Sequence, residues 1–173
     1  MQMSRKNETG FTLVEILIVV IILGVLAAVA IPQFTSSTED AQMSALDMTL
    51  TEMRNAIELY YHQHGAVYPG AKKITDGSSV GTVGDAQTAF NAQMTLYSAK
   101  DGKTANTKDA TYKYGPYIKR GMLPKNPFNG DNAIICDITT GDITTAASSG
   151  TGGWKFYVLT GRLIANDGSH DTN

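Results

Sequence analysis

One stretch of this chain restricts its fold more than any other, namely the apolar run from Phe11 to Ile31. As a helix rising ~1.5 Å per residue, a run of this length covers about 30 Å, which is the hydrocarbon thickness of a bilayer. Within it only Glu15 is charged. We therefore predict a transmembrane helix over residues 11–31, followed by a polar part that folds in water.

The charges around the run predict its orientation. Its nearest basic residues, Arg5 and Lys6, both lie on its N-terminal side. Positive charges favour the cytoplasmic end of a span, so we place residue 1 in the cytoplasm and the bulk of the chain outside. The small residues ending at Ala30 could pass for a signal-peptidase site, but the run is long for a secretory signal and its apolar pattern continues past Pro32. We therefore favour a retained span.

Glu15 is out of place at the start of such a span. An ionised carboxylate costs about 2.5–3.5 kcal/mol at the centre of a membrane helix and less near its end. Glu15 is therefore either tolerated close to the headgroups or matched by a cation. The span has no cationic side chain. Cleavage between Gly10 and Phe11 would create a cation, because a new α-amino group is protonated near neutral pH.

The stretch Gly10-Phe-Thr-Leu-Val-Glu15, followed by the apolar run and Pro32, resembles the start of type IV pilins and type II secretion pseudopilins. The resemblance covers residues 5 to about 38. It implies that an inner-membrane prepilin peptidase removes a leader of residues 1–10 and that Phe11 is N-methylated. It also implies that Glu15 neutralises the N-terminal amine of a neighbouring subunit during assembly.

The same resemblance implies a location and a set of partners. The precursor would sit in the inner membrane with its N-terminus in the cytoplasm, and the assembled form would be a periplasmic or extracellular filament. The partners would be further copies of the chain, the prepilin peptidase and N-methyltransferase, the inner-membrane assembly platform and the minor pilins.

One residue within the run and one just after it weaken the helix. Pro32 lacks a donor N–H and clashes with the preceding turn, and Gly24 is a poor helix former. In filaments of the resembled family, the segment between such residues can lose helicity, and residues 24–32 are the matching stretch. A simple bend at the membrane exit is the other interpretation, and both stay open.

Residues 32–65 predict an amphipathic helix. Apolar residues recur there at spacings of three and four, at Leu46, Leu50, Met53, Ile57 and Tyr60 or Tyr61. This stripe should pack on a sheet formed by the rest of the chain, and Gly65 should end the helix. His62 and His64 diverge on a helix, so we expect both to be exposed rather than to share a metal.

Residues 66–132 predict a connector. Within it, Asp85 should cap a short helix over 85–99 that has Phe90, Met94 and Tyr97 on one face. Three prolines in residues 114–130 exclude a regular strand and indicate a loop pinned onto the core. This loop resembles the segment that precedes the sheet in major pseudopilins.

Residues 133–173 predict a sheet of short strands and a tail. The strands are expected at 133–137, 142–145, 154–159 and 162–165. The fold class is therefore α+β, a long N-terminal helix packed on a small antiparallel C-terminal sheet. The resemblance to pilins implies the same arrangement, the pilin fold. Trp154 should lie in the core, and Cys136 should be a buried, inert thiol.

The tail offers oxygen atoms at alternating positions, from Asp167, Ser169 and Asp171. Such donors suit a hard cation. Because the resembled major pseudopilins bind calcium near the C-terminus, we name calcium as a candidate ligand. A solvated polar tail is the alternative.

Charge and motifs limit the remaining function classes. The net charge is −2 and the pI is about 5.9, so no nucleic-acid partner is predicted. The chain has no glycine-rich phosphate loop, no Gly-x-Ser-x-Gly and no His-Glu-x-x-His motif, so we predict no enzyme. A filament subunit is the leading hypothesis, and a permanently membrane-anchored periplasmic binding or sensor domain is the alternative.

Overall fold

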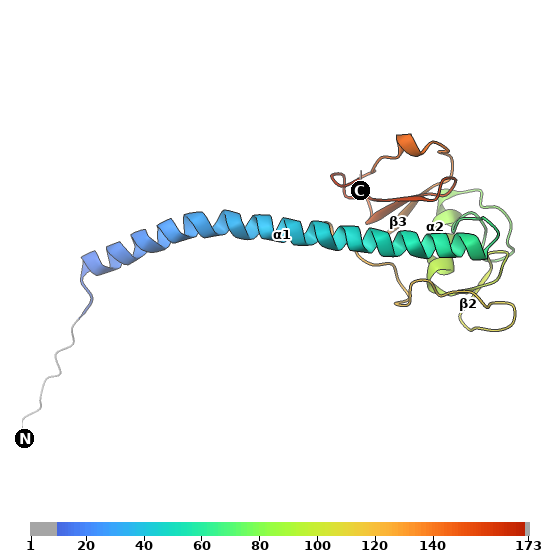
Figure 1. Cartoon of the computed structure of the whole chain (residues 1–173), viewed down its shortest axis with the longest axis horizontal. Helices are drawn as coiled ribbons and strands as arrows, with labels where there is room; N and C mark the ends of the chain where they lie inside the picture. Colours follow the sequence, from blue (N-terminus) through green and yellow to red (C-terminus); the bar gives the residue numbers. More distant parts are fainter. Residues whose placement is uncertain (1–9, 172–173) are drawn as a thin grey trace, which may run out of the picture. The chain divides into compact units, whose positions relative to one another are not determined.

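The computed structural model describes residues 10–171, except for the side chains of residues 29–36. Within these residues, two helices and a set of short strands follow each other along the chain (Figure 1). They are α1 (Leu13–Gln63), α2 (Val83–Thr95), β1 (Tyr97–Ser98), β2 (Thr104–Ala105), β3 (Ile134–Asp137), the 3-10 turn η1 (Ile143–Thr145), β4 (Trp154–Tyr157) and β5 (Arg162–Ala165). The chain divides after Ala41 into two compact units. The predicted α+β class is confirmed.

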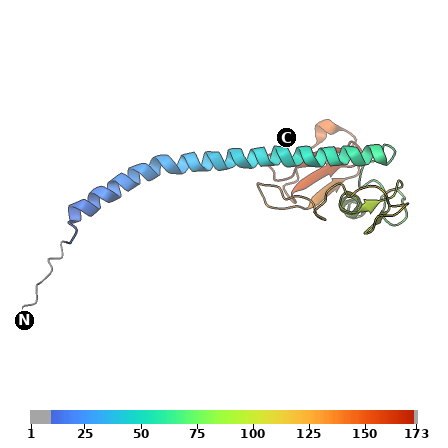
Figure 2. The same ribbon diagram turned by 60° about the horizontal axis from the view of Figure 1, so that its bottom comes forward.

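The first unit contains the N-terminal part of α1. Its backbone is α-helical without interruption through Gly24 and Pro32 (Figure 2). Pro32 removes one hydrogen bond from the ladder but does not end the helix. The segment predicted over 32–65 therefore continues directly from the preceding one. Loss of helicity over residues 24–32 in a filament stays a prediction.

Part of the sequence-based prediction for this unit lies outside the described residues. This holds for residues 1–9 of the leader and for the side chains of 29–31 in the span. Among the helices of the described part, none is long and apolar enough to cross a membrane. The transmembrane helix over 11–31 stays a prediction.

In the second unit, α1 supplies one side of the hydrophobic core. The predicted stripe is confirmed, because five of its side chains are at most 1% exposed: Leu46, Leu50, Met53, Ile57 and Tyr60. They join α2 and the sheet in one buried cluster through Phe90, Met94, Trp154, Phe156 and Leu163. Burying each large apolar side chain contributes roughly 1.5–3 kcal/mol. Cys136 lies in the same cluster, and burial raises the pKa of its thiol to about 12.

The end of α1 corrects one prediction. Gly65 follows the helix with a φ of +70°, as expected for a C-terminal stop. His62 is exposed as predicted, but His64 is only 4% exposed. The His64 ring stacks on Tyr60 with 3.7 Å between centroids, and its Nε2 lies 3.1 Å from Ser98 Oγ. His64 follows Tyr60 by four residues, which places it on the buried face.

The helix predicted over 85–99 is observed as α2, with a different start. Thr82 is its N-cap, and Thr82 Oγ1 accepts the N–H of Asp85 at 3.1 Å. Asp85 is therefore not the cap, and it lies inside the first turn. Tyr97 belongs to β1, which pairs antiparallel with β2. Two of the three predicted core residues are buried in α2 itself, Phe90 and Met94.

The C-terminal sheet has the order β3-β4-β5 and is mixed. β4 and β5 pair antiparallel across a tight turn, as predicted. β3 and β4 pair parallel, with Ile134 opposite Trp154, so this part of the antiparallel prediction is wrong. Parallel neighbours need a crossover of about a dozen residues or more. Residues 138–153 form it, and we call them the crossover loop.

The strand predicted over 142–145 is observed as η1 within the crossover loop. Asp142 Oδ1 accepts the N–H of Thr144 at 2.8 Å and its hydroxyl at 2.7 Å. Short polar side chains that bond nearby backbone groups compete with strand pairing in this way. The local sequence therefore folds on itself instead of joining the sheet.

The proline-rich loop of residues 114–130 is pinned onto the core, as predicted. The N–H of Ile118 donates to Met94 O at 2.8 Å, which ties the loop to the end of α2. The indole N–H of Trp154 donates to Pro124 O, also at 2.8 Å. Trp154 is fully buried, which confirms its place in the core.

Candidate functional site

Helix α1 begins with a reciprocal set of hydrogen bonds between Thr12 and Glu15. Thr12 Oγ1 accepts the N–H of Glu15 at 3.2 Å. Glu15 Oε2 accepts the N–H and the hydroxyl of Thr12, each at 2.8 Å. This is a capping box, in which two side chains satisfy backbone donors that the start of a helix leaves open. It fixes both the first turn and the position of the Glu15 carboxylate.

The predicted cleavage position precedes this cap. Gly10 and Phe11 both lie outside the helix and are exposed, Phe11 to 85%. The peptide bond between them is therefore not held in the helical hydrogen-bond ladder. A peptidase could reach it without unwinding α1.

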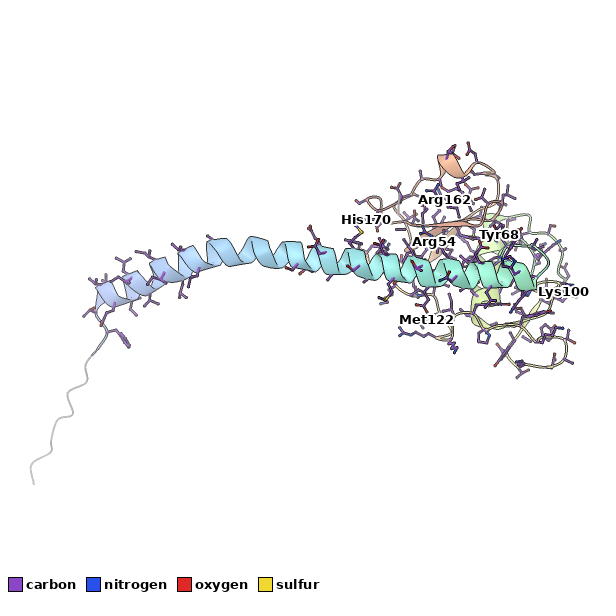
Figure 3. All side chains as sticks on the ribbon, in the orientation of Figure 1. Arg54, Tyr68, Lys100, Met122, Arg162 and His170 are labelled. Atoms are coloured by element: carbon purple, nitrogen blue, oxygen red, sulfur yellow. The ribbon has the colours of Figure 1, made fainter. Side chains whose placement is uncertain are left out.

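The Glu15 carboxylate lies on an apolar helix. The large apolar side chains from Leu13 to Leu26 project from α1, and each of them, like Phe11 just before the helix, is at least half exposed (Figure 3). Soluble monomers rarely expose a continuous apolar surface of this extent. The start of α1 therefore offers one fixed carboxylate within a surface that requires lipid or protein contacts.

Sequence reasoning identified Glu15 but missed Thr12. The signal was readable, because Thr-x-x-Glu is the capping-box spacing. Both bonds from Thr12 converge on Oε2, and within the described residues no hydrogen bond reaches Oε1 of Glu15. The arrangement can therefore hold the carboxylate still while Oε1 accepts a further donor.

The three residues predicted to bind calcium lie in the turn after β5, but the two carboxylates among them, of Asp167 and Asp171, bond different partners. Asp167 Oδ1 accepts the N–H groups of Ser169 at 2.9 Å and His170 at 3.0 Å. Asp171 Oδ2 accepts the N–H of Ser148 at 3.0 Å. Among residues 10–171, no group of three or more His, Cys, Asp or Glu side chains is placed to hold a metal ion. Calcium binding stays a prediction.

The surroundings of Asp167 keep it ionised. Burial alone would raise its pKa, but hydrogen bonds from Ser169, Asn126 and His170 hold the pKa of Asp167 below its ordinary value. His170, labelled in Figure 3, places its Nδ1 3.0 Å from Asp167 Oδ1 and stacks its ring on Phe128 with 3.8 Å between centroids. Asp167 thus ties the turn together by accepting protein donors.

Comparison with known proteins decides the family. Residues 5–31 match the family model of the prokaryotic N-terminal methylation motif. The chain is 30% identical over 152 residues to the type II secretion system core protein G of Vibrio cholerae, covering 87% of each chain. It belongs to the family of type IV pilins and type II secretion pseudopilins.

Other relatives include both branches of this family. Core protein G of Aeromonas hydrophila is 25% identical over 133 residues, which are 77% of this chain and 76% of that protein. Type IV major pilin protein PilE1 of Neisseria gonorrhoeae is 32% identical over 144 residues, which are 79% of this chain and 66% of that protein. The search of solved structures found no significant match. As a member of the pilin and pseudopilin family, the chain is a structural filament subunit and not an enzyme.

Proposed function

We propose that this chain is a core subunit of a type II secretion pseudopilus. The observation that carries the proposal is the similarity to core protein G of Vibrio cholerae, which extends over 87% of both chains. The similarity to PilE1 covers a smaller share, 66%, of that pilin. The proline-rich loop of residues 114–130, which packs on Trp154, also supports the pseudopilin branch.

The start of α1 supports a maturation step. The prepilin peptidase cuts between Gly10 and Phe11, and the new amine of Phe11 is methylated. The exposed, non-helical backbone at this bond supports such a cut. Before assembly, residues 11–31 anchor the subunit in the inner membrane with the N-terminus in the cytoplasm. The inner-membrane assembly platform and the minor pilins then act as partners that move copies of the chain into a periplasmic or extracellular filament.

Glu15 selects the position of the incoming copy. Its carboxylate stays bonded to Thr12 through Oε2, while Oε1 accepts the cationic amine of a neighbouring Phe11. In an apolar surround an unpaired charge is strongly destabilising, whereas a paired one is tolerated. A copy docked out of register would bury the carboxylate and the amine each without its opposite charge. The apolar surface from Phe11 to Leu26 supplies the attraction, and the charge pair supplies the specificity.

Substitution of Glu15 tests this role. We expect Glu15→Gln and Glu15→Ala to be cleaved and inserted normally but to give at least about tenfold fewer filaments, because the neighbouring amine loses its counter-charge. Glu58→Gln is the matched control, since Glu58 is an exposed residue of the same helix. Cleavage is measured by mass spectrometry of the N-terminus, and filament yield by shearing and electron microscopy. Normal filament yield from Glu15→Gln would sink the role.

The type of filament is tested in the native cell. A strain lacking the chain should retain its exported proteins in the periplasm and keep its surface pili. The full-length gene should restore export. Loss of pili with normal export would instead assign the chain to a type IV pilus.

A further inference from the structure

The crossover loop is held by the turn that follows β5, and one side chain makes most of the contacts. Asn166 is fully buried. Its Oδ1 accepts the N–H of Ser149 at 2.6 Å and the hydroxyls of Ser148 at 3.0 Å and Ser149 at 3.1 Å. Its Nδ2 donates to Ser149 Oγ at 3.0 Å and to the carbonyl of Thr151. A single amide thus bonds three residues near the end of the loop, Ser148, Ser149 and Thr151.

Four further hydrogen bonds close the same arrangement. Asp171 Oδ2 accepts the N–H of Ser148, and the hydroxyl of Ser148 accepts the N–H of Gly168 at 3.0 Å. On the other side, Asn126 Nδ2 donates to Asp167 Oδ2 and to Gly153 O, each at 3.0 Å. We call Asn166, Asp171, Ser148 and Ser149 the Asn166 clasp.

Side chains of the sheet then hold the middle of the loop over it. Tyr157 Oη accepts the N–H of Ala147 at 2.8 Å and donates to its carbonyl at 3.0 Å. Lys155 Nζ donates to the same carbonyl at 2.7 Å. Arg162, labelled in Figure 3, donates to the carbonyl of Ile143. Protein groups therefore fasten the loop at both its middle and its end.

This donor set does not fit calcium. A calcium site needs about six to eight oxygen ligands at about 2.3–2.6 Å. Here N–H groups point at Oδ1 and Oδ2 of Asp167 and at Oδ2 of Asp171, and the Asn166 oxygen already accepts three donors. A cation in the same place would meet the positive ends of these N–H dipoles. The groups that could have been ligands are used to bond the loop.

We propose that the Asn166 clasp fixes the crossover loop without a metal ion, so that this subunit folds and keeps its sheet covered independently of calcium. The chain's own side chains thus hold the loop near the C-terminus, which is where the major pseudopilins that the chain resembles bind calcium. Asn166 is a positioning residue in this arrangement. The inference concerns the folded subunit and holds for a pilus or a pseudopilus.

The test is thermal unfolding of the full chain in detergent, followed by the fluorescence of Trp154, its one tryptophan. A ligand that binds only the folded state raises Tm. We expect the wild-type Tm to differ by less than about 1 °C between excess CaCl₂ and excess EGTA. We expect Asn166→Ala to lower Tm by about 4 °C or more in both buffers, because buried partners lose their bonds.

The matched control is Asn91→Ala. Asn91 is exposed, and its Nδ2 donates only to Gln87 O in the preceding turn of α2 at 3.0 Å. It should unfold at or slightly above the wild-type temperature, because Ala is a better helix former than Asn. If Asn166→Ala does not fold, Ser148→Ala removes one hydroxyl of the clasp and should give a smaller loss, again equal in both buffers. A calcium-dependent rise in wild-type Tm would overturn the proposal, and so would clasp variants as stable as Asn91→Ala.

Discussion

The two parts of helix α1 carry similar apolar side chains and bury them to opposite extents. From Phe11 to Leu26 every large apolar side chain is at least half exposed, whereas the stripe that begins at Leu46 is at most 1% exposed. The first part is apolar on all faces, and the second on one. A one-sided stripe can be covered by the chain's own sheet, but an all-round apolar surface needs lipid or several other chains. The distribution of apolar residues around the helix, more than their number, therefore decides which part packs within the subunit and which part needs contacts outside it.

The largest expected effect comes from the buried stripe. Leu50→Ala should lower the free energy of unfolding by about 2–5 kcal/mol, because it removes a fully buried side chain and leaves a cavity. Leu17→Ala is the counterpart in the first part, where the side chain is exposed, and should leave that free energy unchanged. Both are measured by urea unfolding of the full chain in detergent with Trp154 fluorescence. Equal losses of unfolding free energy in Leu50→Ala and Leu17→Ala would contradict the difference in burial between the two parts.

A second, smaller difference in unfolding free energy is expected between variants of the two helix caps. Thr82→Ala removes the cap of α2 and should cost about 1 kcal/mol of unfolding free energy. Thr12→Ala removes the cap of α1 and should leave that free energy unchanged, since no core packs on the first turn. It should instead speed amide hydrogen exchange in the first turn of α1. Protection of that turn as strong as in the wild type would contradict the capping role of Thr12.

The smallest effect is a pH dependence at the end of the stripe. Burial lowers the pKa of His64, while hydrogen bonds to Tyr60 and Ala99 and the charge of Asp101 oppose the shift. The unfolded chain then binds a proton more readily than the folded one, so stability is full above about pH 6.5 and falls as the pH drops below it. Between pH 7.5 and pH 5.5, His64→Gln should lose less stability than the exposed control His62→Gln. Identical pH profiles for the two variants would show that His64 does not contribute.

Much of this fold follows from periodicity in the sequence. The spacing of Leu46, Leu50 and Met53 predicts which face of α1 is buried, because helical geometry alone places those residues together. β5 is also predicted at its observed bounds, since a short, mainly apolar run follows the Thr160-Gly161 turn. These features depend on near neighbours in the chain. They can be derived without knowing how the segments meet.

Other features depend on contacts between distant segments. The parallel pairing of β3 with β4 follows from the path of the crossover loop, which Asn166 fixes from outside the loop. His64 is buried because Ser98 and the Tyr60 ring provide partners for a polar residue. No local pattern encodes such partners. The capping box is the exception, because its Thr12 and Glu15 are close in the chain and the missed signal was already present.

The cap at Thr12 also defines a length. The helix starts at a position set by two side chains, so cleavage after Gly10 would leave one residue ahead of the cap in every copy. A start that slipped by one residue would move the terminal amine by about 1.5 Å along the axis, enough to misplace a charge pair. A fixed start therefore places the terminal amine at the same distance from the helix in every copy. Any subunit can then follow any other in a growing filament, because the amine and the Glu15 carboxylate meet in the same geometry each time.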